Sequence, residues 1–341
     1  MCIRDRDYIP AFLWLGGLLG EAGRLPEQRQ VLQQAMALDP LNELLAVNFA
    51  KNLIAQGDYA AGKDLLHDLV AVKPDSVTLL RTLSGYSIDA GELVEGWRYA
   101  SRSYVLEPES PVVIETLAGA WQSVGEDDEA ERLLLDGLEI AGDNFGLQNS
   151  YFFLLIKQRR LEKAESLLLS QYGSAIGDLP EQLQQFYYFQ KGMIRMVAGD
   201  IESATELIER AISDDSDQGL SESQIMFMTI SSALQAAAGN AKLAELRLSS
   251  AERAVRRARI NGVDDANINY TESSIHALRG NAQAALEKLQ IAYERGFRAL
   301  WLLDLDARMD SLRQEPEFVA LKEQIERDIV QARSEVASLR I

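Results

Sequence analysis

The chain has 341 residues, 47% of them hydrophobic, which is enough for one large or two ordinary globular domains. Its 52 acidic residues outnumber 34 basic residues and give a formal net charge of −18 at pH 7. A charge of this sign repels nucleic acids and anionic membranes, and therefore argues against both as partners of this region. We interpret the acidity as a feature that keeps the protein soluble.

Cys2 is the only cysteine, which excludes an intramolecular disulfide and a cysteine-based metal site. No segment approaches the roughly 18–20 apolar residues needed to span a bilayer. The most apolar stretch, residues 9–20, is short and contains Pro10, and the mixed charges of residues 4–7 do not fit a signal peptide. We expect a soluble region without membrane insertion, cytoplasmic rather than periplasmic unless a membrane-bound regulator carries it.

The chain begins with MCIRDR, which resembles a translated sequencing-adapter scar. We interpret residues 1–6 as a non-native leader and exclude them from the fold. The first expected helix follows near Ile9 and is unusually apolar for a chain end, with six large apolar residues between Phe12 and Leu19. Terminal repeats normally turn a polar face to water. We therefore expect further sequence upstream, or self-association through this first repeat.

Two series of residues recur at a spacing of 34 along the first half of the chain. Pro40, Pro74 and Pro108 form one series, and the other consists of the glycines Gly23, Gly57, Gly91 and Gly125. A fixed period of this length predicts a stack of helix–turn–helix repeats, none of which buries its apolar face alone. Each glycine is expected at the turn between the two helices of a repeat.

The repeats can be followed in chain order. Repeats one to five cover residues 7–172; the fourth is the most regular, and the fifth has Arg159 in place of the turn glycine. Gly62 and Gly96 fall in the middle of second helices, where a glycine is unfavourable by about 0.5–1 kcal/mol relative to alanine. We expect a close approach of the two helices to compensate for this cost.

Residues 173–341 are predicted to continue as divergent repeats six to eight with a C-terminal cap. A loop at residues 173–183 breaks the period, residues 213–223 read as an acidic linker, and two further pairs turn at Gly239 and Gly280. A charged helix from Glu317 to about Leu339 would cover the end of the stack. The predicted fold is all-α: a superhelix of about eight helix pairs and a C-terminal capping helix.

No catalytic, cofactor-binding or metal site is predicted. His67 and His276 are the only histidines, and neither has a second histidine within one helical turn or a cysteine nearby. Asp214 to Asp217 superficially suggest a calcium loop, but the twelfth position would be Ile225 instead of the glutamate such a loop requires. We expect a protein that is not an enzyme and needs no cofactor.

The pattern of repeats one to four resembles the tetratricopeptide repeat (TPR) family. That resemblance implies a concave groove lined by the first helices, which takes an extended or helical peptide or protein segment. Asn48, Lys51 and Arg81 match only part of the two-carboxylate clamp of the co-chaperone members. Carried over position by position, the groove residues are Leu44, Val47, Asn48, Lys51, Thr78, Arg81, Glu115, Gln122, Asn149, Phe153 and Lys157.

Residues 276–325 resemble the closing segment of bacterial multidomain signalling proteins, in which a winged-helix domain, nucleotide cyclase or kinase precedes a TPR array. The matching residues are Gly280, Ala284, Ala285, Trp301, Asp304 or Asp306, Leu312, Arg313, Pro316 and Phe318. Glu317 stands where that family usually has arginine. The resemblance implies the sensory or partner-binding C-terminal region of a transcriptional or signalling regulator; the alternative is a stand-alone scaffold or assembly factor.

Overall fold

The computed structural model describes residues 8–173, 176–212 and 222–339, and within these ranges the regular structure is helical. The expected leader and most of the acidic linker, including Asp214, lie outside the described residues. The helices are α1 (Ile9–Glu21), α2 (Leu25–Leu38), α3 (Glu43–Ala55), α4 (Tyr59–Val72), α5 (Val77–Asp89), α6 (Leu93–Leu106), α7 (Pro111–Ser123), α8 (Asp127–Ile140), α9 (Phe145–Lys157), α10 (Leu161–Tyr172), η1 (Ile176–Asp178), α11 (Glu181–Val197), α12 (Ile201–Ala211), α13 (Glu222–Ala237), α14 (Ala241–Ile260), α15 (Ala266–Leu278), α16 (Ala282–Glu294), α17 (Leu300–Leu305), η2 (Ala307–Leu312) and α18 (Pro316–Leu339).

The helices pack in consecutive pairs, from α1 with α2 to α15 with α16, which confirms the predicted all-α array. The predicted turn glycines have positive φ angles, for example 81° at Gly57 and 80° at Gly91. This left-handed conformation favours glycine because a Cβ atom would crowd the backbone. Arg159 adopts the same conformation with φ 56°, so repeat five keeps the turn at the expense of local strain.

The two mid-helix glycines confirm the expected close crossings. A Cβ atom on Gly96 would lie 2.5 Å from Cγ1 of Ile88 and 3.0 Å from the backbone oxygen of Ser84, both on the paired helix α5. Gly62 is equally confined by Ile54 on α3. Since any side chain at these positions would push the paired helices apart, the glycines set the helix separation within repeats two and three.

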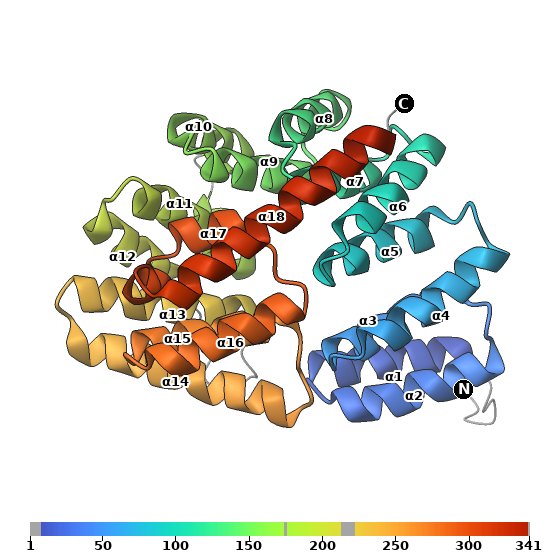
Figure 1. Cartoon of the computed structure of the whole chain (residues 1–341), viewed down its shortest axis with the longest axis horizontal. Coiled ribbons are helices and arrows are strands. Elements are labelled where there is room, and N and C mark those ends of the chain that lie inside the picture. Colours follow the sequence, from blue (N-terminus) through green and yellow to red (C-terminus); the bar gives the residue numbers. More distant parts are fainter. Residues whose placement is uncertain (1–7, 174–175, 213–221, 340–341) are drawn as a thin grey trace.

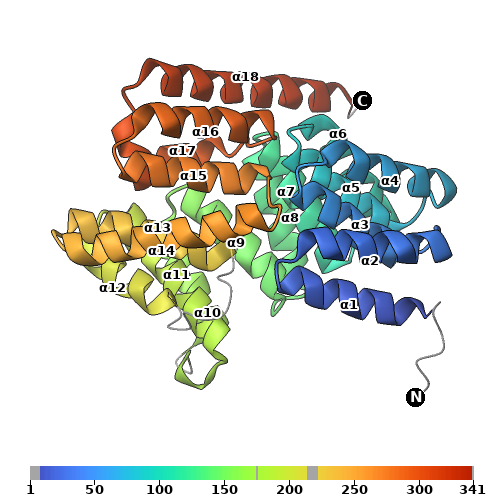
Figure 2. The same ribbon diagram turned by 90° about the horizontal axis from the view of Figure 1, so that it is seen from below.

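The array curves back on itself. In Figure 1 the chain runs from the blue repeats through the green and yellow ones, and α18 crosses back toward α6; Figure 2 shows the same return from another side. The first half of α18 covers the C-terminal repeats as predicted, with Phe318 and Ile325 in their core. Its second half goes further, because Ala332 and Val336 join the buried cluster that contains Trp97 of α6. The superhelix is therefore closed into a ring.

A buried ion pair stabilises the C-terminal end. The Arg308 guanidinium donates to Asp306 at 2.6 Å, and both side chains are about 95% buried. The Tyr270 hydroxyl donates to the same carboxylate at 2.5 Å, and Arg308 also reaches the Thr229 hydroxyl at 2.5 Å. Burial alone would raise the pKa of Asp306, but Arg308 and these hydrogen bonds outweigh it and hold that pKa below its usual value.

Candidate functional site

The predicted groove residues all lie on the first helices of repeats two to five. Leu44, Val47, Asn48 and Lys51 are on α3, Thr78 and Arg81 on α5, Glu115 and Gln122 on α7, and Asn149, Phe153 and Lys157 on α9. Because the period is 34, residues at equivalent positions form rows that run across neighbouring helices. The rows divide into an outer half, toward the helix N-termini, and an inner half, toward the turns.

The inner half of the groove is partly covered. A chamber of about 780 Å³ lies between it and the returning C-terminal segment, and Lys51, Gln122 and Lys157 are the predicted groove residues that line it. Trp301 of α17 lines the opposite wall. The returning C-terminal end of the chain therefore partly covers the inner half of the predicted groove.

The outer half lies outside this chamber and remains accessible. Leu44 is 56% exposed, and Thr78 is also exposed. The Arg81 Nε atom donates to the Val112 carbonyl and to the Thr116 hydroxyl, both at 3.1 Å, which fixes the guanidinium above α7. Within the described part of the chain, Arg81 has no acidic partner. Its free nitrogen atoms can therefore bind a carboxylate of a ligand.

The remaining groove residues mostly bind one another or their neighbours. Lys157 donates to Asp127 at 2.6 Å, Glu115 accepts from Ser150 at 3.2 Å, and Asn149 accepts from Gln190 at 3.3 Å. The Asn48 amide donates to the carbonyl of Leu44 on its own helix. The partial carboxylate clamp thus reduces to Lys51 and Arg81, which lie in different halves of the groove.

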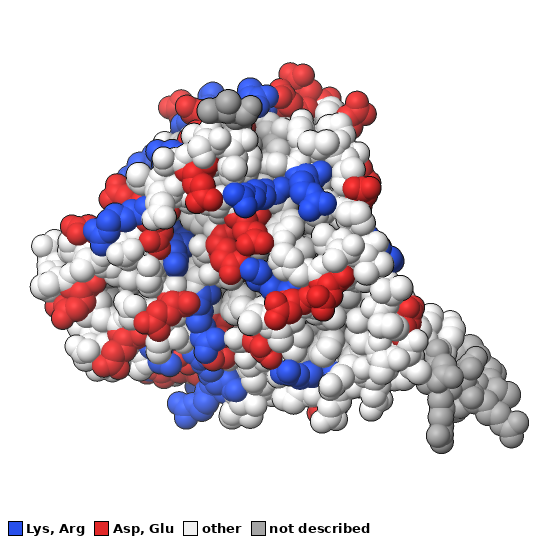
Figure 3. Space-filling model, turned by 45° about the vertical axis from the view of Figure 1, so that its right-hand side comes forward, with Lys and Arg blue, Asp and Glu red and all other residues white. Residues whose placement is uncertain are grey.

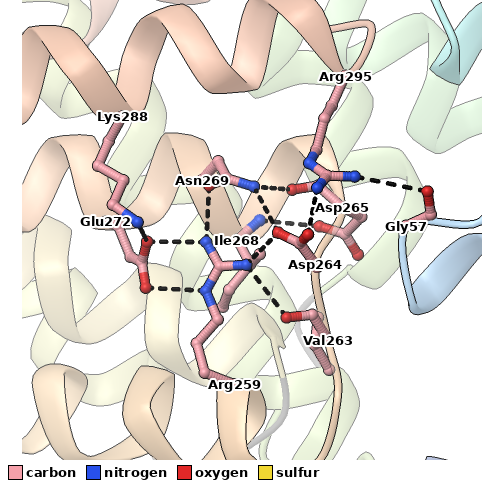
Figure 4. Close-up of polar contacts among 10 residues, drawn as sticks. All are labelled: Gly57, Arg259, Val263, Asp264, Asp265, Ile268, Asn269, Glu272, Lys288 and Arg295. Atoms are coloured by element: carbon pink, nitrogen blue, oxygen red, sulfur yellow. Dashed lines mark hydrogen bonds and ion pairs between the residues drawn. The ribbon is translucent and has the colours of Figure 1, made fainter.

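A polar network joins the two ends of the ring beside the chamber (Figure 4). The backbone N–H of Asp264 donates to the Ala55 carbonyl at 2.9 Å, and Arg295 reaches the Gly57 carbonyl at 3.5 Å while pairing with Asp264. Arg259 binds Asp264, Asn269 and Glu272. The network holds the segment before α15 against the turn of repeat two.

Two carboxyl groups, those of Asp89 and Asp265, repel each other across this junction. Asp89, at the end of α5, lines the chamber and its side chain is exposed to the water there, but the surrounding protein, together with Asp265, raises its pKa to about 6. Burial also raises the pKa of Asp265, although its carboxylate accepts from the Ile268 N–H. The nearby Tyr59 hydroxyl has a pKa raised to about 12, again chiefly by burial.

Among the described residues, no group of three or more histidine, cysteine, aspartate or glutamate side chains is placed to hold a metal ion. The part of the chain that the structure covers also contains no helix that is both long and apolar enough to cross a bilayer. On the face shown in Figure 3, basic and acidic side chains are interspersed without forming separate fields.

Comparison with solved structures agrees with this architecture. A chain of the APC/C hetero-tetramer Cut9–Hcn1 superposes with a TM-score of 0.52 at 13% identity, over 95% of this chain and 57% of that chain. Human IFIT1, solved as a dimer with PPP-AAAA, superposes with a TM-score of 0.54 at 16% identity, over 84% of this chain and 72% of that one. This chain thus spans little more than half of the Cut9–Hcn1 chain's length.

At these identities the comparisons show the fold, and the fold is a TPR-like superhelical array. No protein-family model matches the sequence. No curated relative matches it either.

Sequence reasoning missed the chamber wall and the junction network. Arg295 and Asp264 follow no 34-residue period, and Gly296, although it lies 34 residues after Gly262, does not continue the series of turn glycines. Nothing in the repeat pattern therefore marks them as partners of repeats two and three. Trp301 was noticed through the family resemblance alone, and the structure places it in the chamber wall. The available signal was the departure of residues 295–305 from an ordinary repeat.

Proposed function

We propose that this chain is a non-enzymatic module that binds a protein or peptide segment along the outer half of its concave groove. The main support is the alignment of accessible positions on consecutive first helices, with Leu44, Thr78 and Arg81 at their centre. A rigid surface of this kind loses little conformational entropy when it binds an extended segment. Its apolar rim with one available guanidinium suits an amphipathic peptide that carries an acidic residue.

Charge reversal at Arg81 tests this proposal. Peptides selected from a displayed random 12-residue library on the wild-type chain should be enriched in acidic and apolar residues. Arg81→Glu should weaken the selected peptides at least about tenfold by isothermal titration calorimetry, because an attractive contact becomes repulsive. Arg132→Glu is the matched control, since Arg132 is exposed on α8 and pairs only with Glu129 and Asp136 of its own helix. Equal binding by both variants would move the site elsewhere.

At a finer level, we propose that the module is the sensory or partner-binding region of a bacterial transcriptional or signalling regulator. The resemblance of residues 276–325 to the closing segment of such proteins supports this. Two residues of that signature, Leu312 and Phe318, are buried in the C-terminal core. Sequencing the source DNA upstream of Asp7 tests the idea: an in-frame winged-helix, cyclase or kinase domain supports it, and a native start codon next to Asp7 contradicts it.

The alternative is a stand-alone scaffold that self-associates through α1. Trp14 and Leu18 are 77% and 59% exposed, and α1 carries no charged residue before Glu21. A second copy could pack on this face without the repulsion that a chain of net charge −18 meets elsewhere.

Sedimentation velocity tests the self-association. Trp14→Glu should convert an associated chain to monomers, because it places a charge in the middle of the apolar face. Val105→Glu is the control, because Val105 is 80% exposed on α6, well away from α1. A wild-type chain that sediments as a monomer at tens of micromolar would exclude this alternative.

A further inference from the structure

Three consecutive turns of the array are each covered by an arginine from the C-terminal end. Arg295 lies over Gly57, Arg298 over Gly91 and Arg333 over Gly125. Arg333 donates to the Val124 carbonyl at 3.2 Å, next to its glycine, as Arg295 does to the Gly57 carbonyl. We call Gly57, Gly91 and Gly125 the turn ladder, and Arg295, Gly296, Arg298 and Arg333 the clasp.

The chemistry of helix ends explains why arginine suits the turns at Gly57 and Gly125. Arg298, at the middle turn, instead donates to the Tyr293 and Phe297 carbonyls of its own segment and pairs with Asp328. The turn ladder lies at the C-termini of α3, α5 and α7, where the last carbonyl groups have no partner within the helix. These ends carry the negative pole of the helix dipole and favour cations. A guanidinium group supplies both the positive charge and several N–H donors in one plane.

The fit is closest at the middle turn. Gly296 has φ 107°, and a Cβ atom there would collide with the backbone oxygen of Asp89 and lie 2.7 Å from the Cα atom of Ala90. Its own Cα is 3.3 Å from the position of a Cβ on Gly91. Such an approach of two backbones is possible only with glycine on both sides.

Other turns of the same array lack this cover. Gly199, Gly239 and Gly280 have φ angles of 80°, 81° and 74°, but a Cβ atom on any of them would meet nothing within 4 Å. The docked turns are thus distinguished from ordinary turns by their contacts and not by their conformation. The contact is selective for repeats two to four, whose first helices also line the chamber.

We propose that the turn ladder is a docking surface for an arginine-bearing segment, and that the chain's own clasp occupies it and closes the inner groove to the peptide partner. This inference rests on the proposed peptide-binding function. Opening the clasp would uncover Gln122 and Lys157, which are partly buried, beside the already exposed Lys51, and would extend the binding surface from the outer half to the whole groove. A partner that supplies its own arginine-bearing segment would compete with the clasp.

Gly296→Val tests the docking. Small-angle X-ray scattering should show a larger radius of gyration than for wild type, and hydrogen exchange should increase at residues 55–58 and 89–92. A peptide with the sequence of residues 294–303, ERGFRALWLL, should bind the variant at least about tenfold more tightly than wild type, because the internal segment no longer competes. Gly280→Val is the matched control, because Gly280 also has a positive φ, 74°, but has open space around it.

Arg333→Glu provides a second variant that does not depend on backbone strain. Its side chain is 45% exposed on α18, so the substitution should leave the helix intact while repelling the α7 C-terminus. Arg327→Glu is its control, because Arg327 pairs only with Glu323 of its own helix.

Unchanged scattering, hydrogen exchange and peptide binding in Gly296→Val and Arg333→Glu would overturn the docking proposal. Because scattering and exchange need no partner, they report on the clasp even if library selection yields no peptide. If the ring opens in a variant but the variant binds the 294–303 peptide no more tightly than wild type does, the proposal that the turn ladder is a docking surface is wrong, while closure of the groove by the clasp stands.

Discussion

Replacing Asp306 by alanine is expected to lower the free energy of unfolding of the C-terminal repeats by about 3–5 kcal/mol. The substitution leaves the Arg308 guanidinium about 95% buried without its counter-charge, and removes the acceptor of the Tyr270 hydroxyl. Burying an unpaired charge costs far more than losing a surface ion pair. Urea unfolding followed by far-UV circular dichroism measures this loss. If the two ends of the array unfold in separate transitions, each transition is fitted by itself.

Asp304→Ala is the matched control for this experiment. Asp304 lies two residues away and forms an ion pair with Lys322, but its side chain is 51% exposed. Its loss should therefore cost less than about 1 kcal/mol. A loss of similar size in both variants would mean that the buried pair contributes no more than a surface pair.

The repeat period predicted the helix pairs because its cause is local. A turn glycine every 34 residues and glycine at the close crossings are conditions that each repeat satisfies by itself, so Gly57 and Gly96 could be assigned from spacing alone. The chain length of a repeat and its helix pairing are then fixed by sterics. The same spacing placed the residues of the predicted groove on the first helices of their repeats, which is where the structure has them.

Ring closure could not be predicted in this way, because it joins residues far apart in sequence. The contact between Arg295 and the Gly57 carbonyl spans 238 positions, and its geometry depends on the accumulated curvature of all the intervening repeats. A small change in the angle between neighbouring repeats would add up along the array and would move Arg295 out of reach of the Gly57 carbonyl. No residue pattern shows that accumulated curvature, so only the structure distinguishes an open outer half of the groove from a partly covered inner half.

Closure of the ring also accounts for the raised pKa of the Asp89 carboxyl group. Asp89 is the last residue of α5, and its backbone oxygen lies where Gly296 approaches. Removing the Asp89 carboxylate would leave this backbone contact unchanged but would remove the repulsion between Asp89 and Asp265. In an open superhelix, water would surround Asp89 and its pKa would return toward 3.8. We therefore expect the raised pKa of Asp89 to depend on the closed ring.

Asp89→Asn is accordingly expected to stabilise the ring at pH 7.5, to keep about 70% of that effect at pH 5.5, and to have little effect at pH 3.8 and below. The pKa of Asp89 is about 6 in the folded chain and 3.8 for the free side chain, so folding favours the protonated form. The ionised Asp89 carboxylate therefore lowers the free energy of unfolding. This destabilisation is fully present above pH 6, decreases as the pH falls through 6, and is gone below 3.8. Allowing for screening by water in the chamber, we expect about 1 kcal/mol at pH 7.5, which corresponds to a melting temperature about 2–4 °C higher than wild type.

The measurement is the difference in melting temperature between wild type and Asp89→Asn at pH 3.8, 5.0 and 7.5. The charged or titratable groups around Asp89 are Asp265 on the opposite segment, Tyr59 and Tyr86 on the N-terminal side, and Arg295 near Tyr59. Because both chains share these groups, their contributions largely cancel in the difference, and what remains reports on Asp89. Combining the substitution with Gly296→Val sharpens the test: once the ring is open, Asp89 and Asp265 separate, and the pH dependence of the difference should vanish. If it persists in the opened chain, the raised pKa arises within repeat three alone and the link between Asp89 and closure is wrong.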